Sequence, residues 1–284
     1  MVLNDDPEAA TSWSARRPRL LGDLATLVVI FGILLTVYLL PADTSLRQVR
    51  EAGRIAACMP DRYPPLVTGD AEAPGFDVEL LRAVAARLGV TLTISPNSAI
   101  GRDFNPRNWR VTRAQCQILA GGVVLSWDVR SFLDTVPTPL STGWAVVSPT
   151  PVPALDGLRV GVFPGLTGLD RIQLGRYLRD TGATPKLLPA AADLEAGLQS
   201  GEIDAAVTEG LAAAQLAETN GWTVQWLPPP FERLPLGLGL WRGDLTLGKA
   251  IAAAMRDLER DGSLEALQDK YRIGTIDGIL GEGP

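Results

Sequence analysis

Short apolar strands alternate with amphipathic helices along most of this chain, and this alternation restricts the possible folds more than any other feature. Residues 75–89, GFDVELLRAVAARLG, place apolar side chains at helical spacing and end on glycine, and the strand VTLTI follows at 90–94. At 158–168, LRVGVFPGLTG, another strand enters a glycine-rich turn before the next helix. Strands separated by helices of this length predict an α/β fold with parallel sheets and helices on both faces.

Length, charge and one missing residue type limit the functions that this chain can have. At 284 residues it exceeds one typical core, so we expect two domains or two lobes. The net charge of −6 and the scattered basic residues argue against nucleic acid as a partner. The sequence contains no histidine, which excludes Ser-His-Asp and Cys-His catalysis and the usual zinc ligands. Carboxylates, lysine or tyrosine could still act in catalysis, but we predict no catalytic residue, metal or cofactor and no enzyme.

An uncharged apolar run, LATLVVIFGILLTVYLL, occupies residues 24–40. With the two residues after it, the run approaches the ~20 residues that span a bilayer. Arginines precede the run at Arg16, Arg17 and Arg19, whereas Asp43 follows it. The positive-inside rule therefore places the N-terminus in the cytoplasm and the main body outside.

The alternative to a transmembrane anchor is a cleavable signal peptide, since Leu-Pro-Ala before Asp43 loosely resembles a cleavage site. The apolar run and the polar extension before it are both long for a signal peptide, so we favour the anchor. We therefore predict a cytoplasmic segment at residues 1–21 and a transmembrane anchor at residues 22–42. The body would then lie in an oxidising compartment.

The two cysteines, Cys58 and Cys116, are interpreted in the light of that compartment. Two cysteines permit one disulfide, and two separate buried thiols are the alternative. A disulfide here would close a loop of nearly sixty residues, and the chain-entropy model gives it roughly 4 kcal/mol of stabilisation.

Six segments, in order, resemble the bacterial extracellular solute-binding proteins of the amino-acid ABC transporter type, family 3. The resemblance runs from Arg54 to Gly274. The segments are GFDVELLRAVAARLGV, a glycine-rich strand end with an arginine eight residues on, LDGLRVGVFPGLTG, LQSGEIDAAVTEG, LPLGLGLWRGD and DLERDGSLEALQDKYRIG. The resemblance implies the type 2 periplasmic-binding fold, in which two α/β lobes close like a hinge on a ligand.

The same resemblance implies a division of the chain. Lobe 1 would comprise residues 43–141 and 237–274, and lobe 2 residues 142–236, followed by a C-terminal tail at 275–284. The two crossings between the lobes would lie near residues 142–148 and 231–236.

A zwitterionic amino acid needs a cation for its carboxylate and an anion for its ammonium group. By resemblance, Arg130 clamps the carboxylate, and Thr167 meets it at a helix N-terminus, where Gly165 allows close approach. Glu209 stands where the family carries an acidic residue for the ammonium, and Tyr63 matches an aromatic residue that covers the ligand. Alternatively, Arg130 is a surface residue and Thr167 an ordinary helix cap.

Several positions depart from the family pattern. Asp61 is shifted by one from the usual aspartate, and Ser126 ends a segment that usually reads Thr-x-Thr. One extra residue separates Gly122 from Arg130. Trp127 could shape the pocket, although tryptophans more often pack in cores. The first lobe therefore keeps the arginine but lacks part of the usual polar cradle.

We expect a membrane-anchored periplasmic solute-binding protein for an amino acid or similar small carboxylate, held at the bacterial inner membrane by a single span and feeding an ABC-type permease. The alternative is an accessory subunit of a membrane or periplasmic redox complex, with a degenerate or empty cleft. The positions of Cys58 and Cys116 resemble those of solute-binding-like proteins associated with quinoprotein dehydrogenases, and by that resemblance the two cysteines would pair.

Overall fold

The computed structural model describes residues 17–39, 43–100, 106–165 and 168–273. The chain divides into two units, residues 1–42 and residues 43–284. In the first unit, α1 spans Arg17–Leu39 and exposes its apolar side chains between Leu24 and Leu35. Within the described residues, no helix has both the length and the apolar character of a membrane span.

Several predictions fall on residues that the structure does not describe. These residues are most of the cytoplasmic segment 1–21, the end of the anchor at 40–42, Thr167 and the tail at 275–284. The anchor, the orientation and the cellular location therefore stay predictions.

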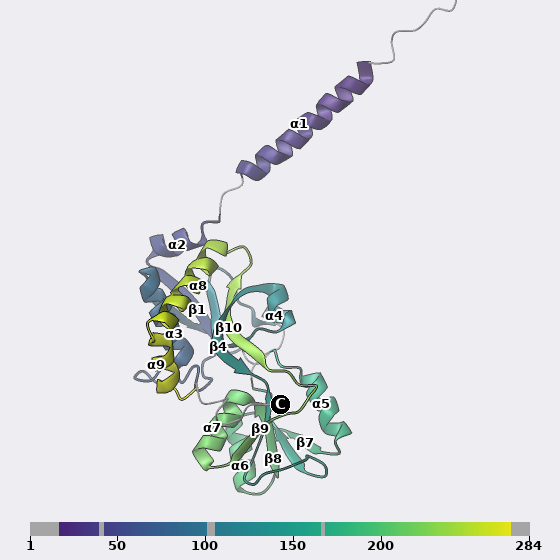
Figure 1. Cartoon of the computed structure of the whole chain (residues 1–284), viewed down its shortest axis with the longest axis vertical. Coiled ribbons are helices and arrows are strands. Elements are labelled where there is room, and N and C mark those ends of the chain that lie inside the picture. The colour runs from purple at the N-terminus through teal and green to yellow at the C-terminus, as the bar shows by residue number, and fades with distance from the viewer. Residues whose placement is uncertain (1–16, 40–42, 101–105, 166–167, 274–284) are drawn as a thin grey trace, which may run out of the picture. The chain divides into compact units, whose positions relative to one another are not determined.

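The described strands of the second unit form two sheets, one in each lobe (Figure 1). The strands of the first sheet lie in the order β2-β1-β3-β10-β4. Their bounds are β1 Arg54–Met59, β2 Thr91–Pro96, β3 Ile118–Val124, β4 Leu133–Thr142 and β10 Leu234–Trp241. The helices of this lobe are α2 Ser45–Ala52, α3 Phe76–Leu88, α4 Trp127–Phe132, α8 Leu245–Arg260 and α9 Ser263–Lys270, with a short 3₁₀ helix at Pro106–Trp109. Helices α3, α8 and α9 pack against one another.

The second sheet has the order β7-β6-β8-β5-β9. Its strands are β5 Trp144–Ser148, β6 Arg159–Val162, β7 Thr184–Leu187, β8 Ala205–Glu209 and β9 Thr223–Trp226. The helices are α5 Arg171–Asp180, α6 Ala191–Gln199 and α7 Gly210–Asn220. Strands β5 and β8 are buried along their whole length, as expected for the interior of a sheet covered on both faces.

Both sheets are mixed, so the expectation of purely parallel sheets is wrong. In the first sheet, β1 pairs in parallel with β2 and β3, whereas β10 runs antiparallel to β3 and β4. The reason lies in the connections between the lobes. β4 leaves the first lobe at Thr142 and β10 enters it at Leu234, directly opposite, so the two strands must run in opposite directions. The corresponding strands of the second lobe, β5 and β9, are antiparallel for the same reason.

The crossings between the lobes lie side by side. The first is made at Gly143, between β4 and β5, and the second by residues 227–233, between β9 and β10. A side chain at Gly143 would approach the carbonyl oxygen of Glu232 to 3.2 Å, and the backbone N–H of Leu227 donates to the carbonyl of Trp144 at 2.8 Å. A Cβ at position 143 would therefore require the neighbouring crossing to shift by a few tenths of an ångström.

The disulfide between Cys58 and Cys116 is formed, which confirms that prediction. Cys58 lies in β1, and Cys116 lies just before β3, which is the neighbour of β1 in the sheet. Both residues are buried in a cluster that includes Trp109 and Leu119. The disulfide thus ties the segment that precedes β3 to the neighbouring strand β1.

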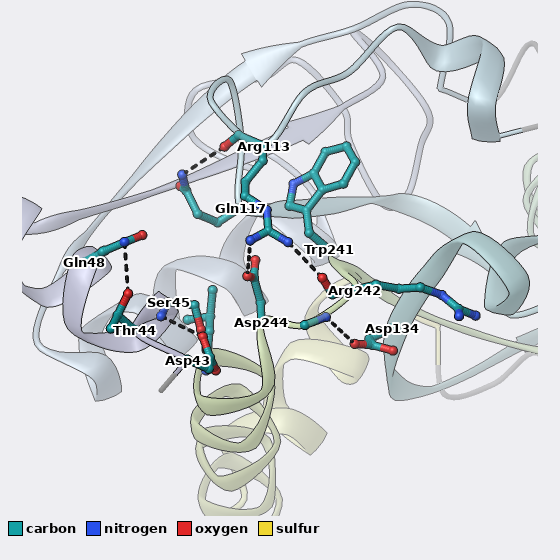
Figure 2. A network of polar contacts seen from close by, with 12 residues as sticks. Asp43, Thr44, Ser45, Gln48, Arg113, Gln117, Asp134, Trp241, Arg242 and Asp244 are labelled. Carbon is teal, nitrogen blue, oxygen red and sulfur yellow. Dashed lines mark hydrogen bonds and ion pairs between the residues drawn. The ribbon is translucent and has the colours of Figure 1, made fainter. Parts of the chain in front are cut away.

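The first residues of the second unit are held at the N-terminus of α8 (Figure 2). The carboxylate of Asp43 accepts a hydrogen bond from the backbone N–H of Thr246, and Ser45 Oγ accepts one from the N–H of Leu247 at 3.2 Å. These N–H groups have no partner within the helix, so the two side chains cap α8. The hydrogen bonds hold the pKa of Asp43 well below its usual value.

Candidate ligand-binding cleft

A cavity of about 550 Å³ lies between the two lobes, within the size range of small-molecule sites. The first lobe lines it with residues 60–63, Ser98 and Ile100, and the second lobe with residues 163–165, Arg171 and residues 187–189. Of the predicted site residues, Asp61, Tyr63 and Gly165 border this cavity. The other described candidates, Ser126, Trp127, Arg130 and Glu209, are not among its lining residues.

Glu209 is fully buried at the end of β8, where it caps the N-terminus of α7. Its Oε1 accepts hydrogen bonds from the Tyr63 hydroxyl at 2.5 Å and the Ala212 N–H at 2.6 Å. Its Oε2 accepts from the Thr142 hydroxyl at 2.7 Å and the Leu211 N–H at 2.9 Å. A carboxylate can accept about four hydrogen bonds, so these four donors occupy all of its acceptor positions. The ammonium group of a ligand would have to displace one of them.

The bond between Tyr63 and Glu209 connects the two lobes. Burial raises the pKa of the Glu209 carboxyl, although its four hydrogen bonds oppose that shift. Burial and the neighbouring Glu209 raise the pKa of the Tyr63 hydroxyl well above its usual value. Tyr63 therefore stays protonated at neutral pH and acts as the donor. The lobes are joined here by a hydrogen bond between protein groups.

Two glycines of the second lobe lie against side chains with very little space. Gly165 has φ +60°, and a Cβ there would lie 2.6 Å from Glu209 Cγ and 3.1 Å from the Tyr63 hydroxyl. Gly168 has φ +105°, and a Cβ there would lie 2.8 Å from Val124 Cβ in the first lobe. Both glycines therefore lie against protein atoms, and the role of Gly165 toward a ligand stays a prediction.

Helix α4 carries three of the predicted residues. Ser126 caps the helix by accepting a hydrogen bond from the Val129 N–H at 3.4 Å. Trp127 is 82% exposed, so it is not a core residue. Arg130 is also exposed, and the buried position on this helix is Val129.

Asp77, in the first turn of α3, is a site residue that the sequence analysis missed. Its side chain is buried and accepts hydrogen bonds from the N–H groups of Gly121 at 2.7 Å and Gly122 at 3.3 Å. Both glycines have positive φ, and a Cβ at Gly121 would collide with Pro60, which lines the cavity. Asp77 therefore positions the turn beside the cleft. An acidic residue directly after Gly75-Phe76 in an apolar helix was the available signal.

Comparisons with known proteins agree with this architecture. No protein-family model matches the chain. The L-cystine-binding protein TcyJ of Escherichia coli K12 is 25% identical over 237 residues, which cover 80% of this chain and 85% of TcyJ.

Solved structures show the same fold. A substrate-binding protein of an ABC uptake transporter from Streptococcus pneumoniae, with bound histidine, matches with a TM-score of 0.67 at 16% identity and covers 84% of this chain and 99% of its own. The ancestral amino-acid-binding protein AncCDT-1, described as a precursor of cyclohexadienyl dehydratase, matches with a TM-score of 0.63 at 19% identity. The match covers 80% of this chain and 99% of AncCDT-1. By name, TcyJ and these two proteins are binding proteins. The solved structures show that this chain has the two-lobe fold of these binding proteins, and the similarity to TcyJ supports the resemblance to family 3 of the bacterial extracellular solute-binding proteins.

Proposed function

We propose that this protein binds a small carboxylate-bearing solute, of the size of an amino acid, between its lobes and delivers it to an ABC-type transporter. The body would be held at the outer face of the inner membrane by the N-terminal helix. The observation that carries the proposal is the cavity between the lobes, which charged side chains border from both sides. TcyJ is named for binding L-cystine, and the Streptococcus pneumoniae protein holds histidine, which supports a ligand of this size.

The test uses the full-length chain in mild detergent. Thermal melting and isothermal titration calorimetry are carried out with the standard amino acids, L-cystine and a series of small mono- and dicarboxylates. We expect at least one compound to raise the melting temperature in proportion to the logarithm of its concentration, because a ligand that binds only the folded state stabilises it by mass action. The proposal is wrong if none of these compounds binds.

A second function is favoured by two specific observations. The predicted carboxylate clamp, Arg130, is exposed and does not border the cavity, and Glu209 already has four protein donors. Both suit an accessory subunit that uses this fold to bind another protein. Extraction in gentle detergent followed by native mass spectrometry would reveal a stable companion protein. A bare monomer would contradict the accessory role, and ligand binding in the first test would favour transport.

A further inference from the structure

We propose that the cavity selects small carboxylates with an apolar body, and that the α-ammonium group contributes little to their recognition. The inference rests on the proposed function and narrows its class of ligand. It predicts that fatty or aromatic acids without an amino group bind about as well as the corresponding amino acids.

The first step concerns the anion that would be needed for an ammonium group. Glu209 is fully buried and is not among the described lining residues of the cavity, whereas Tyr63, whose hydroxyl donates to Glu209 Oε1, borders it. A ligand amine would break this 2.5 Å bond and leave a buried hydroxyl without its acceptor. The remaining acidic residue among the described lining residues is Asp61, which is exposed. Exposed ion pairs contribute little to binding because water screens them.

The second step concerns the space between the glycine turn of the second lobe and the strand end of the first. Gly168 lies so close to the first lobe that an added Cβ would be 2.8 Å from Val124 Cβ and 3.4 Å from Ser126 Oγ. Gly165 packs equally closely on Glu209 and Tyr63. Protein atoms therefore pack closely at these two glycines, and we assign the ligand to the cavity that Arg171 and Ile100 border.

The third step concerns the lining of that cavity. Two of its three described charged residues are arginines, Arg62 and Arg171, and the third is Asp61. Arg171 is half-buried at the first position of α5, and a guanidinium group carries five N–H donors that suit a carboxylate. The apolar part of the lining comes from Ile100 of the first lobe and from Phe163 and Leu187 of the second. This combination fits an anionic head and an apolar body.

The experiment compares matched pairs of ligands on the full-length chain by isothermal titration calorimetry. The pairs are L-phenylalanine with hydrocinnamate and L-leucine with isocaproate, which differ only in the α-amino group. We expect the two members of a pair to bind with affinities within about tenfold, since an exposed ion pair is worth at most about fivefold in affinity. If Glu209 recognised the amine, loss of a buried charge pair would cost more than about thirtyfold.

Each outcome decides between the hypotheses. If the amino acids bind and the affinity of their des-amino partners is lower by more than about tenfold, this inference is overturned and the proposed function stays intact. If neither these pairs nor the wider series of amino acids and carboxylates bind, the proposed function fails and the inference fails with it. Des-amino acids that bind within tenfold of the amino acids support both.

Variants separate the roles of the two sites. Arg171→Gln should weaken both members of a pair by about tenfold or more, because a charge-assisted hydrogen bond is lost. Arg176→Gln, an exposed arginine on the same helix, is the matched control and should change affinity by less than about twofold. Tyr63→Phe frees one acceptor position on Glu209 and should improve the amino acid relative to its des-amino partner. Equal effects of the two arginine variants would refute the assignment of Arg171.

Discussion

Asp77 supplies a prediction that can be worked through from the structure. Burial raises the pKa of this carboxyl to about 6 from an ordinary value of 3.8, although the N–H groups of Gly121 and Gly122 act in the opposite direction. Between these two pH values the folded chain keeps a proton that the unfolded chain has released. Because the unfolded state then binds fewer protons, the stability contributed by this group falls as the pH rises through the window.

The magnitude follows from the difference in pKa. A difference of about two corresponds to about 3 kcal/mol of unfolding free energy, which is present below about pH 4 and lost by about pH 7. Asp77→Asn retains an oxygen that can accept from the two glycines but cannot titrate. The wild type therefore loses about 3 kcal/mol of unfolding free energy from this group between about pH 4 and about pH 7, and we expect Asp77→Asn to lack that loss.

The assay is urea denaturation of both proteins at a series of pH values across that window, monitored by tryptophan fluorescence. Asp180→Asn, at the exposed end of α5, is the control and should follow the wild-type profile. If the profiles of Asp77→Asn and the wild type run parallel, Asp77 is ionised throughout the window in the folded chain, and the reasoning from burial is refuted.

Three further predictions concern stability and can be checked by thermal or urea denaturation. Gly168→Ala should destabilise the protein by more than about 1 kcal/mol, because of its positive φ and the contact with Val124, whereas Gly175→Ala inside α5 should be neutral or stabilising. Asp43→Ala should cost about 0.5–2 kcal/mol through loss of the α8 cap, and an unchanged melting temperature would contradict the capping role. Replacement of Cys58 and Cys116 by serine should cost roughly 4 kcal/mol at most, and the reduced wild type should then melt at the same temperature as the double variant.

The local pattern of the sequence was sufficient for much of the fold. The apolar spacing and the final glycine of residues 75–89 predicted a helix, and the structure has α3 at Phe76–Leu88 with Gly89 as its left-handed cap. Cys58 and Cys116 suggested one disulfide because the chain contains no other cysteine. The direction of β10 was not predictable in this way, because strand direction depends on which neighbour the crossing brings alongside.

The candidate site depended much more on tertiary structure. The sequence placed Tyr63 and Glu209 in the same cleft, but it could not show that they would bind each other across 146 positions of the chain. The exposure of Arg130 depended on how α4 packs, because this helix buries Val129 and leaves Arg130 in solvent.

The sequence by itself therefore determined many of the helices and strands of this protein. Helix spacing and glycine caps are set by neighbours along the chain. Only the tertiary structure decided which side chains meet between the lobes. Hydrogen bonds such as those on Glu209 join groups from distant segments, and their geometry depends on the packing of whole sheets. For that reason the cavity between the lobes is bordered by Arg171, which sequence reasoning did not select, while Arg130 lies exposed on α4.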